Sequence, residues 1–135
     1  MLHANPTAQG FEVILPATAG EAWLLSSSWV PHHHRASPDR RNLGVVLRHL
    51  TLTDDTGNVR RIDAADPRLV FGFHAIEGGG SAIRWTTGWA LLPATLWAGM
   101  SGAVRLCLAL DTGATRRWVA PSRSAAVQQS VSLAA

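Results

Sequence analysis

The stretch Val104-Arg105-Leu106-Cys107-Leu108-Ala109-Leu110 decides the fold class. Branched apolar side chains occupy every second position from Val104 to Leu110, which is the period of a β-strand with one buried face. The turn formers Asp111-Thr112-Gly113 follow directly, and residues 115–119 behind them again have the pattern of a strand. The two segments together predict a β-hairpin.

Short segments of this kind follow one another along almost the whole chain. Turn clusters rich in Gly and Asp separate them, and residues 54–58 form the loop of a second predicted hairpin. Helical signals are confined to one turn within 93–100 and to the tail after residue 122. The pattern predicts an all-β fold, an antiparallel, jelly-roll-like β-sandwich of about 8–9 short strands. We expect these strands at residues 11–16, 22–30, 44–53, 59–63, 70–76, 82–86, 89–92, 104–110 and 115–119.

Length and composition indicate one folded domain. The chain has 135 residues, of which 47% are hydrophobic and 16% are charged, as in a protein that buries a core. We expect a disordered or extended leader at 1–10, a single sandwich domain at 11–120 and a flexible tail at 121–135.

The sequence alone does not reveal where the protein is located. No apolar run approaches the roughly 20 residues needed to cross a bilayer, so no membrane span is expected. The first ten residues are polar and lack the apolar core of a signal peptide. The localisation is therefore left open: cytoplasmic by default, or exported if these residues belong to a larger secreted protein.

The positive charge does not predict a nucleic-acid partner. The formal net charge is +3, and all 12 basic residues are Arg. Pairs of Arg occur at 40–41, 60–61 and 116–117, but they belong to different segments and form no long basic run. A nucleic-acid surface is expected to gather its basic residues on one element.

No arrangement typical of catalysis is found in the sequence. It has no phosphate-binding Gly-rich loop, no zinc-protease motif and no nucleophile elbow. Cys107 is the only cysteine and lies on a predicted strand, so we expect an inert thiol and no disulfide. The three residues His32, His33 and His34 are interpreted as a solvated loop, because no convincing further metal ligand lies nearby. We therefore expect neither an enzyme nor a cofactor.

Two interpretations stay open for the polar residues of 74–84. His74 and Glu77 precede the turn Gly78-Gly79-Gly80, and Arg84 follows it. In one interpretation these residues are ligands for a hydroxyl-rich molecule. In the other, Glu77 and Arg84 form an ion pair that closes a hairpin, with His74 hydrogen-bonded beside it.

The chain is also rich in tryptophan, with 6 Trp, 3 Phe and no Tyr. A core of this size is too small to bury six indoles fully, because each is large and needs a partner for its N–H group. One or two exposed indoles beside Arg or Asp would make a platform on which a sugar ring stacks. The alternative is that they close the ends of the sandwich.

Two stretches resemble a known family of bacterial modules. The first is Trp23-Leu-Leu-Ser-Ser-Ser-Trp-Val-Pro31 followed by Asp39-Arg-Arg-Asn-Leu-Gly-Val-Val-Leu47. The second is Gly72-Phe-His-Ala-Ile-Glu77 followed by Ile83-Arg-Trp-Thr-Thr-Gly-Trp-Ala-Leu-Leu92. The pattern is similar to the β-sandwich module at the C-terminal end of alphaproteobacterial Hint (hedgehog/intein) domain proteins, and to related modules beside bacterial glycosyltransferases. The likeness covers roughly residues 11–120.

The resemblance implies a non-catalytic accessory sandwich in proteins that act at the cell surface. The residues of Hint self-cleavage are absent, so that activity is not implied. Thr87 and Trp89 depart from the family pattern, which often has Asp or a small polar residue there. The matching positions that give candidate ligand-binding residues are Asp39, Arg41, His74, Glu77, Arg84 and Trp85.

The same positions also suit a structural role. Asp39 is expected to accept backbone N–H bonds, and Arg41 to reach a carboxylate such as Glu77. Gly44 would then allow close packing at the start of a strand.

The sequence thus leads to two functional hypotheses. The first is a non-catalytic module that binds carbohydrate or another cell-envelope polymer. The alternative is a structural domain that docks onto a partner enzyme domain or self-associates. A glycan-active enzyme is the least favoured interpretation.

Overall fold

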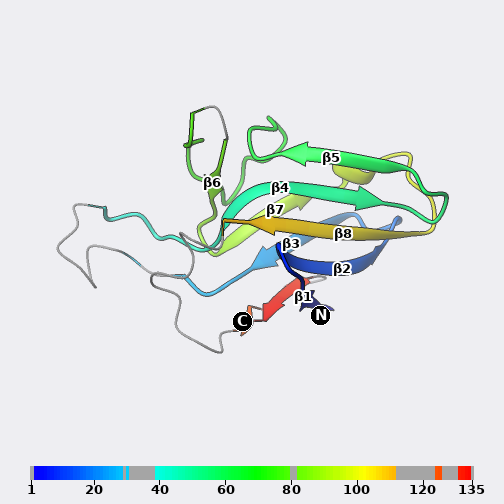
Figure 1. Ribbon diagram of the computed structural model, residues 1–135, viewed down its shortest axis with the longest axis horizontal. Coiled ribbons are helices and arrows are strands. Elements are labelled where there is room, and N and C mark those ends of the chain that lie inside the picture. Colours follow the sequence, from blue (N-terminus) through cyan, green and yellow to red (C-terminus); the bar gives the residue numbers. More distant parts are fainter. Residues whose placement is uncertain are drawn as a thin grey trace.

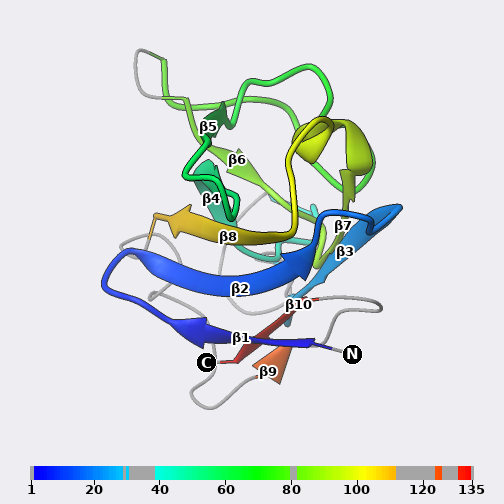
Figure 2. The ribbon, with the colours of Figure 1, turned by 90° about the vertical axis from the view of Figure 1, so that its right-hand side faces the viewer.

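The computed structural model is an all-β sandwich and describes residues 2–28, 30, 39–79, 82–111, 124–125 and 131–134. Two layers of strands face one another (Figures 1 and 2). Within the described residues there are ten strands and one short 3₁₀ helix, η1 (Ala94–Trp97). The strands are β1 (Leu2–Pro6), β2 (Gly10–Pro16), β3 (Glu21–Leu25), β4 (Val46–Thr53), β5 (Val59–Asp63), β6 (Arg84–Trp85), β7 (Trp89–Pro93), β8 (Ala103–Leu110), β9 (Ser124–Ala125) and β10 (Val131–Ala134).

The first layer is antiparallel and has β8 at its centre. β8 pairs with β2 over seven positions and with β4 on its other side, and β4 pairs with β5 as a hairpin. The short β6 adds to the start of β4. Leu106 and Leu108 on β8 are buried, as are Leu50 and Leu52, their partners on β4. The period-2 pattern thus turns one face of each strand into the core.

The second layer consists of β7, β3, β10 and β9, and β1 joins it to the first. Asn5 and Pro6 of β1 pair antiparallel with β2, whereas Leu2, His3 and Ala4 pair parallel with β10. The order of the strands is therefore continuous across both layers: β5-β4-β8-β2-β1-β10-β3-β7. Ala22 and Leu24 of β3, with Ala90 and Leu92 of β7, close the core from this side.

The all-β, antiparallel sandwich is confirmed, and several predicted elements need correction. The segment 70–76 is not a strand: it carries turns and isolated bridges, and positive-φ Gly72 lets it turn beside β7. β1 and β10 belong to the sheet, so the fold extends beyond the predicted boundaries at 11 and 120. These two strands are short: β1 pairs with β2, the next strand along the chain, and β1 and β10 pair with each other across almost the full length of the chain. The predicted strand 115–119 and the hairpin that it would form with β8 lie outside the described residues.

The loop of the β4–β5 hairpin is organised by Asp54, a buried carboxylate. Its Oδ1 atom accepts hydrogen bonds from the Thr56 hydroxyl at 2.6 Å, from the Thr56 amide at 2.9 Å and from the Asn58 amide at 3.0 Å. Its Oδ2 atom accepts one from the Ser101 amide at 3.0 Å, which ties the loop to the start of β8. These hydrogen bonds favour the charged form and lower the pKa of Asp54 from 3.8 to about 2.

Asp54→Asn tests this arrangement through the pH dependence of stability. A pKa that is lowered in the folded state contributes stability above pH 4, which is lost as the pH falls towards 2. We expect the variant to unfold at lower urea than the wild type at pH 7, and the difference to shrink between pH 4 and pH 2. Urea titrations at pH 7, 4, 3 and 2 measure this, and a difference that stays constant with pH would contradict it.

Leu106→Ala tests the central position of β8. Leu106 is fully buried between the two layers, so the substitution should lower the free energy of unfolding by about 2–5 kcal/mol. Ile14→Ala on the neighbouring β2 is the matched control, because the Ile14 side chain is 52% exposed and should change stability by about 0.5 kcal/mol or less. Equal losses of unfolding free energy in the two variants would contradict the buried, central position of Leu106 on β8. Urea unfolding followed by Trp fluorescence gives both values.

Candidate functional site

Segments 43–46 and 73–86 meet in a tight backbone seam beside β4. The Gly44 amide donates to the carbonyl oxygen of Thr86 at 2.7 Å, and the Thr86 amide donates to Val45 at 2.9 Å. The buried Thr86 hydroxyl accepts a further bond from the Val45 amide at 3.1 Å. A Cβ atom on Gly44 would lie 2.5 Å from the Gly88 nitrogen, so only glycine fits here. The predicted close packing at Gly44 is confirmed.

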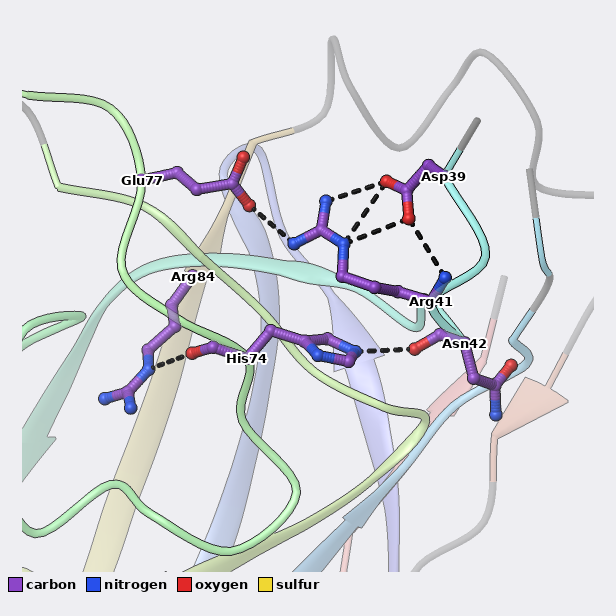
Figure 3. A network of polar contacts seen from close by, with 6 residues as sticks. All are labelled: Asp39, Arg41, Asn42, His74, Glu77 and Arg84. Atoms are coloured by element: carbon purple, nitrogen blue, oxygen red, sulfur yellow. Dashed lines mark hydrogen bonds and ion pairs between the residues drawn. The ribbon is translucent and has the colours of Figure 1, made fainter. Parts of the chain in front are cut away.

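Arg41 joins two carboxylates above this seam (Figure 3). Its NH2 and Nε atoms donate to both oxygens of Asp39 at 2.8–3.2 Å, and its NH1 atom donates to Glu77 Oε2 at 3.0 Å. Asp39 also accepts from the Arg41 amide at 2.9 Å. The side-chain hydrogen bonds from Arg41 hold the pKa of Asp39 below its ordinary value and, in return, raise the pKa of Arg41. Both contacts expected of Asp39 and Arg41 are confirmed.

His74 and Arg84 bond to backbone carbonyls. The His74 Nε2 atom lies 2.8 Å from the carbonyl oxygen of Asn42, and Arg84 Nε donates to the carbonyl oxygen of His74 at 2.7 Å. Figure 3 shows the Arg84 guanidinium turned away from Glu77. Burial lowers the pKa of Arg84, whose guanidinium carbon lies 5.5 Å from the centre of the Phe73 ring. The expected Glu77–Arg84 ion pair is replaced by the Glu77–Arg41 pair.

The six predicted site residues therefore gather at one end of the sandwich, and their contacts are largely with one another and with the backbone. Asp39, Arg41 and Glu77 form one group, while His74 contacts the backbone of Asn42 and Arg84 donates to the backbone of His74. Trp85 is half-buried on β6, opposite Val46. These contacts are the ones that a structural role requires, and a ligand-binding role for the six residues stays a prediction.

A second feature lies on the outer face of the β3–β7 pair, where three aromatic rings meet. The Trp23 and Trp89 rings are 5.3 Å apart between centroids, and the Phe71 ring packs edge-on against Trp23 at 5.6 Å. Trp89 is 54% exposed and Phe71 is 60% exposed. The Trp23 indole N–H donates to Glu21 at 3.2 Å, which fixes the orientation of the central ring. We call Trp23, Phe71 and Trp89 the aromatic platform.

The local sequence explains why these rings are outside. On β3 and β7 the inner face is already filled by small or aliphatic residues, which leaves Trp23 and Trp89 on the outer face. Phe71 joins them because the Leu91 amide donates to its carbonyl oxygen at 3.0 Å, which holds segment 70–72 beside β7. The sequence left an indole platform as one of two alternatives and did not identify Phe71. The available signal was the run Trp89-Ala-Leu-Leu92, which is apolar on both faces of a strand at the edge of a sheet.

Other candidate chemistry finds little support in the described residues. They contain no group of three or more His, Cys, Asp or Glu placed to hold a metal ion, and no helix long and apolar enough to cross a membrane. His32–His34 lie outside them. The Cys107 thiol is half-buried, and burial, together with the charge of Glu12, raises its pKa and disfavours the nucleophilic thiolate.

Comparisons with protein-family models, with curated proteins and with solved structures give no match. The function is therefore argued from the site geometry, together with the sequence resemblance described above.

Arg41→Gln tests whether the Asp39–Arg41–Glu77 group holds segment 73–86 in place. The ion pairs are about 40% exposed, so the loss in unfolding free energy should be about 1 kcal/mol or less. We expect faster hydrogen exchange at the Ile83 amide, which donates to the backbone carbonyl oxygen of Glu77 in the native structure. Arg105→Gln, which removes a long surface contact to Glu12 at 4.0 Å, is the control and should leave that amide unchanged. Unchanged exchange in Arg41→Gln would contradict the bracing role.

Proposed function

We propose that this chain is a non-catalytic module that binds carbohydrate on the aromatic platform. The observation that carries the proposal is the exposed pair Trp89 and Phe71, set around an indole whose orientation is fixed by Glu21. A sugar ring presents apolar C–H groups on its face, and these pack against aromatic rings. Rings that are already ordered lose little conformational entropy when a ligand binds.

The surroundings of the platform provide hydrogen-bonding groups for sugar hydroxyls. The Glu21 carboxylate lies at one side, and Thr87, two residues before Trp89, donates its hydroxyl to the Trp89 carbonyl at 3.1 Å. The exposed side chain of Asn42 donates to the carbonyl oxygen of Thr87 at 3.2 Å. An apolar centre with a few polar groups at its rim is the usual composition of a small-molecule site.

The sequence resemblance to accessory modules of Hint proteins supports the non-catalytic part of the proposal. In the described residues the carboxylates of the candidate site accept hydrogen bonds from Arg41, rather than facing one another across a cleft. Glycoside hydrolysis would need two carboxyl groups on opposite sides of a bound sugar.

Docking to a protein partner is the second candidate, and one observation favours it. Val70 and Ile76 are 68% and 49% exposed, which adds aliphatic surface on the segment that carries Phe71. Exposed apolar side chains on one segment also occur at protein contacts. A docking surface predicts self-association or partner binding that Val70→Ser weakens, whereas sugar binding on the platform should not depend on Val70.

Titration with soluble glycans, followed by NMR of the indole N–H groups, tests the proposal. We expect a saturable shift of the Trp23 and Trp89 signals with at least one neutral oligosaccharide, and a loss of affinity of about tenfold or more in Trp89→Ala and Phe71→Ala. Trp85→Ala and Glu77→Gln serve as controls on the other candidate residues and should keep the binding. Loss of binding in the controls, with the platform variants unaffected, would move the site to the Asp39–Arg41–Glu77 group.

A further inference from the structure

A polar cleft lies on the outer face of the other layer, across β4 and β5. Its volume is about 670 Å³, within the range of small-molecule sites. Strands β4, β5 and β8, the β1–β2 turn and the loop after β5 contribute to its walls. The polar side chains that line it belong to Gln9, Arg48, His49, Arg61 and Asp63.

A β-bulge in β4 presents two consecutive polar side chains to this cleft. Leu47 pairs with Leu110 of β8, but the next pair is His49 with Ala109, so Arg48 is the extra residue. The strand faces inwards at Leu47 and again at Leu50, while Arg48 and His49 both line the cleft. Bulges redirect side chains in this way and are frequent beside binding sites.

The charged side chains of the cleft carry a net positive charge. Arg61 Nε donates to Asp63 Oδ1 at 3.3 Å, so these two charges offset each other. Within the part of the chain that the structure describes, no hydrogen bond or ion pair engages the Arg48 guanidinium. The charge of Arg48 is therefore not offset within the cleft. A second guanidinium group, that of Arg61, lies on the neighbouring strand β5.

The pKa of the His49 ring responds to these charges. Burial lowers its pKa, and the positive charges of Arg61 and Arg48 lower it further, while Asp63 acts in the opposite direction. These are the charged groups facing the imidazole from β4 and β5, and β8 contributes Ala109 opposite it. A ligand that brings negative charge into the cleft would relieve this field.

We propose that the cleft formed by Arg48, His49, Arg61 and Gln9 binds a small ligand through a carboxylate or phosphate group. Guanidinium groups pair with both kinds of anion through two parallel N–H bonds. The Gln9 amide and the His49 ring add hydrogen-bonding groups for the remainder of the ligand. This site lies on the opposite layer from the aromatic platform and does not depend on the proposed glycan binding.

Backbone NMR of the intact chain tests the proposal with three sugars: glucuronate, glucose 6-phosphate and neutral glucose. We expect saturable shifts of the Arg48 and His49 amides with at least one of the two anions and none with glucose. Binding of only one anion identifies the recognised group. The absence of saturable shifts with both anions would overturn the proposal.

Variants separate a specific site from general attraction of anions. Arg48→Gln should weaken anion binding about tenfold, whereas Arg105→Gln, which removes the same charge from the same sheet, should stay within about twofold of the wild type. Asp63→Asn removes the negative charge of the cleft and should strengthen binding about threefold. Equal weakening by Arg48→Gln and Arg105→Gln would reduce the effect to net charge and overturn the site.

The titration of His49 gives a readout that needs no variant. The bound anion should raise the pKa of the His49 ring, so binding should strengthen as the pH falls through that pKa. A His49 titration that is the same with and without saturating anion would contradict an anion in the cleft. Trp89→Ala should leave all of these results unchanged, so failure of the glycan proposal is distinguishable from failure of this one.

Discussion

Burial of one face of β8 between two neighbouring strands is the constraint on which the rest of the structure depends. Leu106 and Leu108 contact the core, with β2 on one side and β4 on the other. Because side chains alternate along a strand, a register shift of one residue would move the whole leucine row to the solvent. The register of β2, β4 and β5 follows from this requirement. The bulge at Arg48 is where β4 departs from it, and that departure shapes the outer cleft.

The polar groups at the end of the sandwich position segments more than they stabilise the fold. The buried hydrogen bonds of Thr86 with Gly44 and Val45 are made without solvent competition and hold segment 73–86 against β4. The Arg41 ion pairs lie at the surface, where such pairs contribute little free energy. Their geometric effect is larger, since they set where Glu77 and the hairpin above β4 lie (Figure 3). Residues that stand out in the sequence can therefore serve to position segments of the fold.

Strands with strong alternation could be predicted from the sequence, and elements that depend on distant partners could not. β5 begins and ends where expected, and β2, β4, β7 and β8 lie close to their predicted bounds, because each has a clear period or a turn beside it. β1 and β10 are short, and part of their pairing is with each other, between opposite ends of the chain. Charge offered both Arg41 and Arg84 as partners for Glu77, and only the tertiary structure decides for Arg41. The apolar run Trp89–Leu92 indicates exposed aromatic surface on β7, but the packing of Phe71 on Trp23 and the bulge at Arg48 depend on tertiary packing and register.

The aromatic platform and the cleft formed by Arg48, His49, Arg61 and Gln9 lie on opposite outer faces of one sandwich. This separation limits which ligands can contact both sites at once. The buried core lies between them, because β3 and β7 form one layer and β4 and β5 the other (Figure 2). Two facing sheets are about 10 Å apart, so a short oligosaccharide reaches one site and not both. Substitutions at such separated sites are expected to act additively. A long acidic polymer that bends around the edge of the sandwich could contact both, and its avidity would then exceed the affinity of either site.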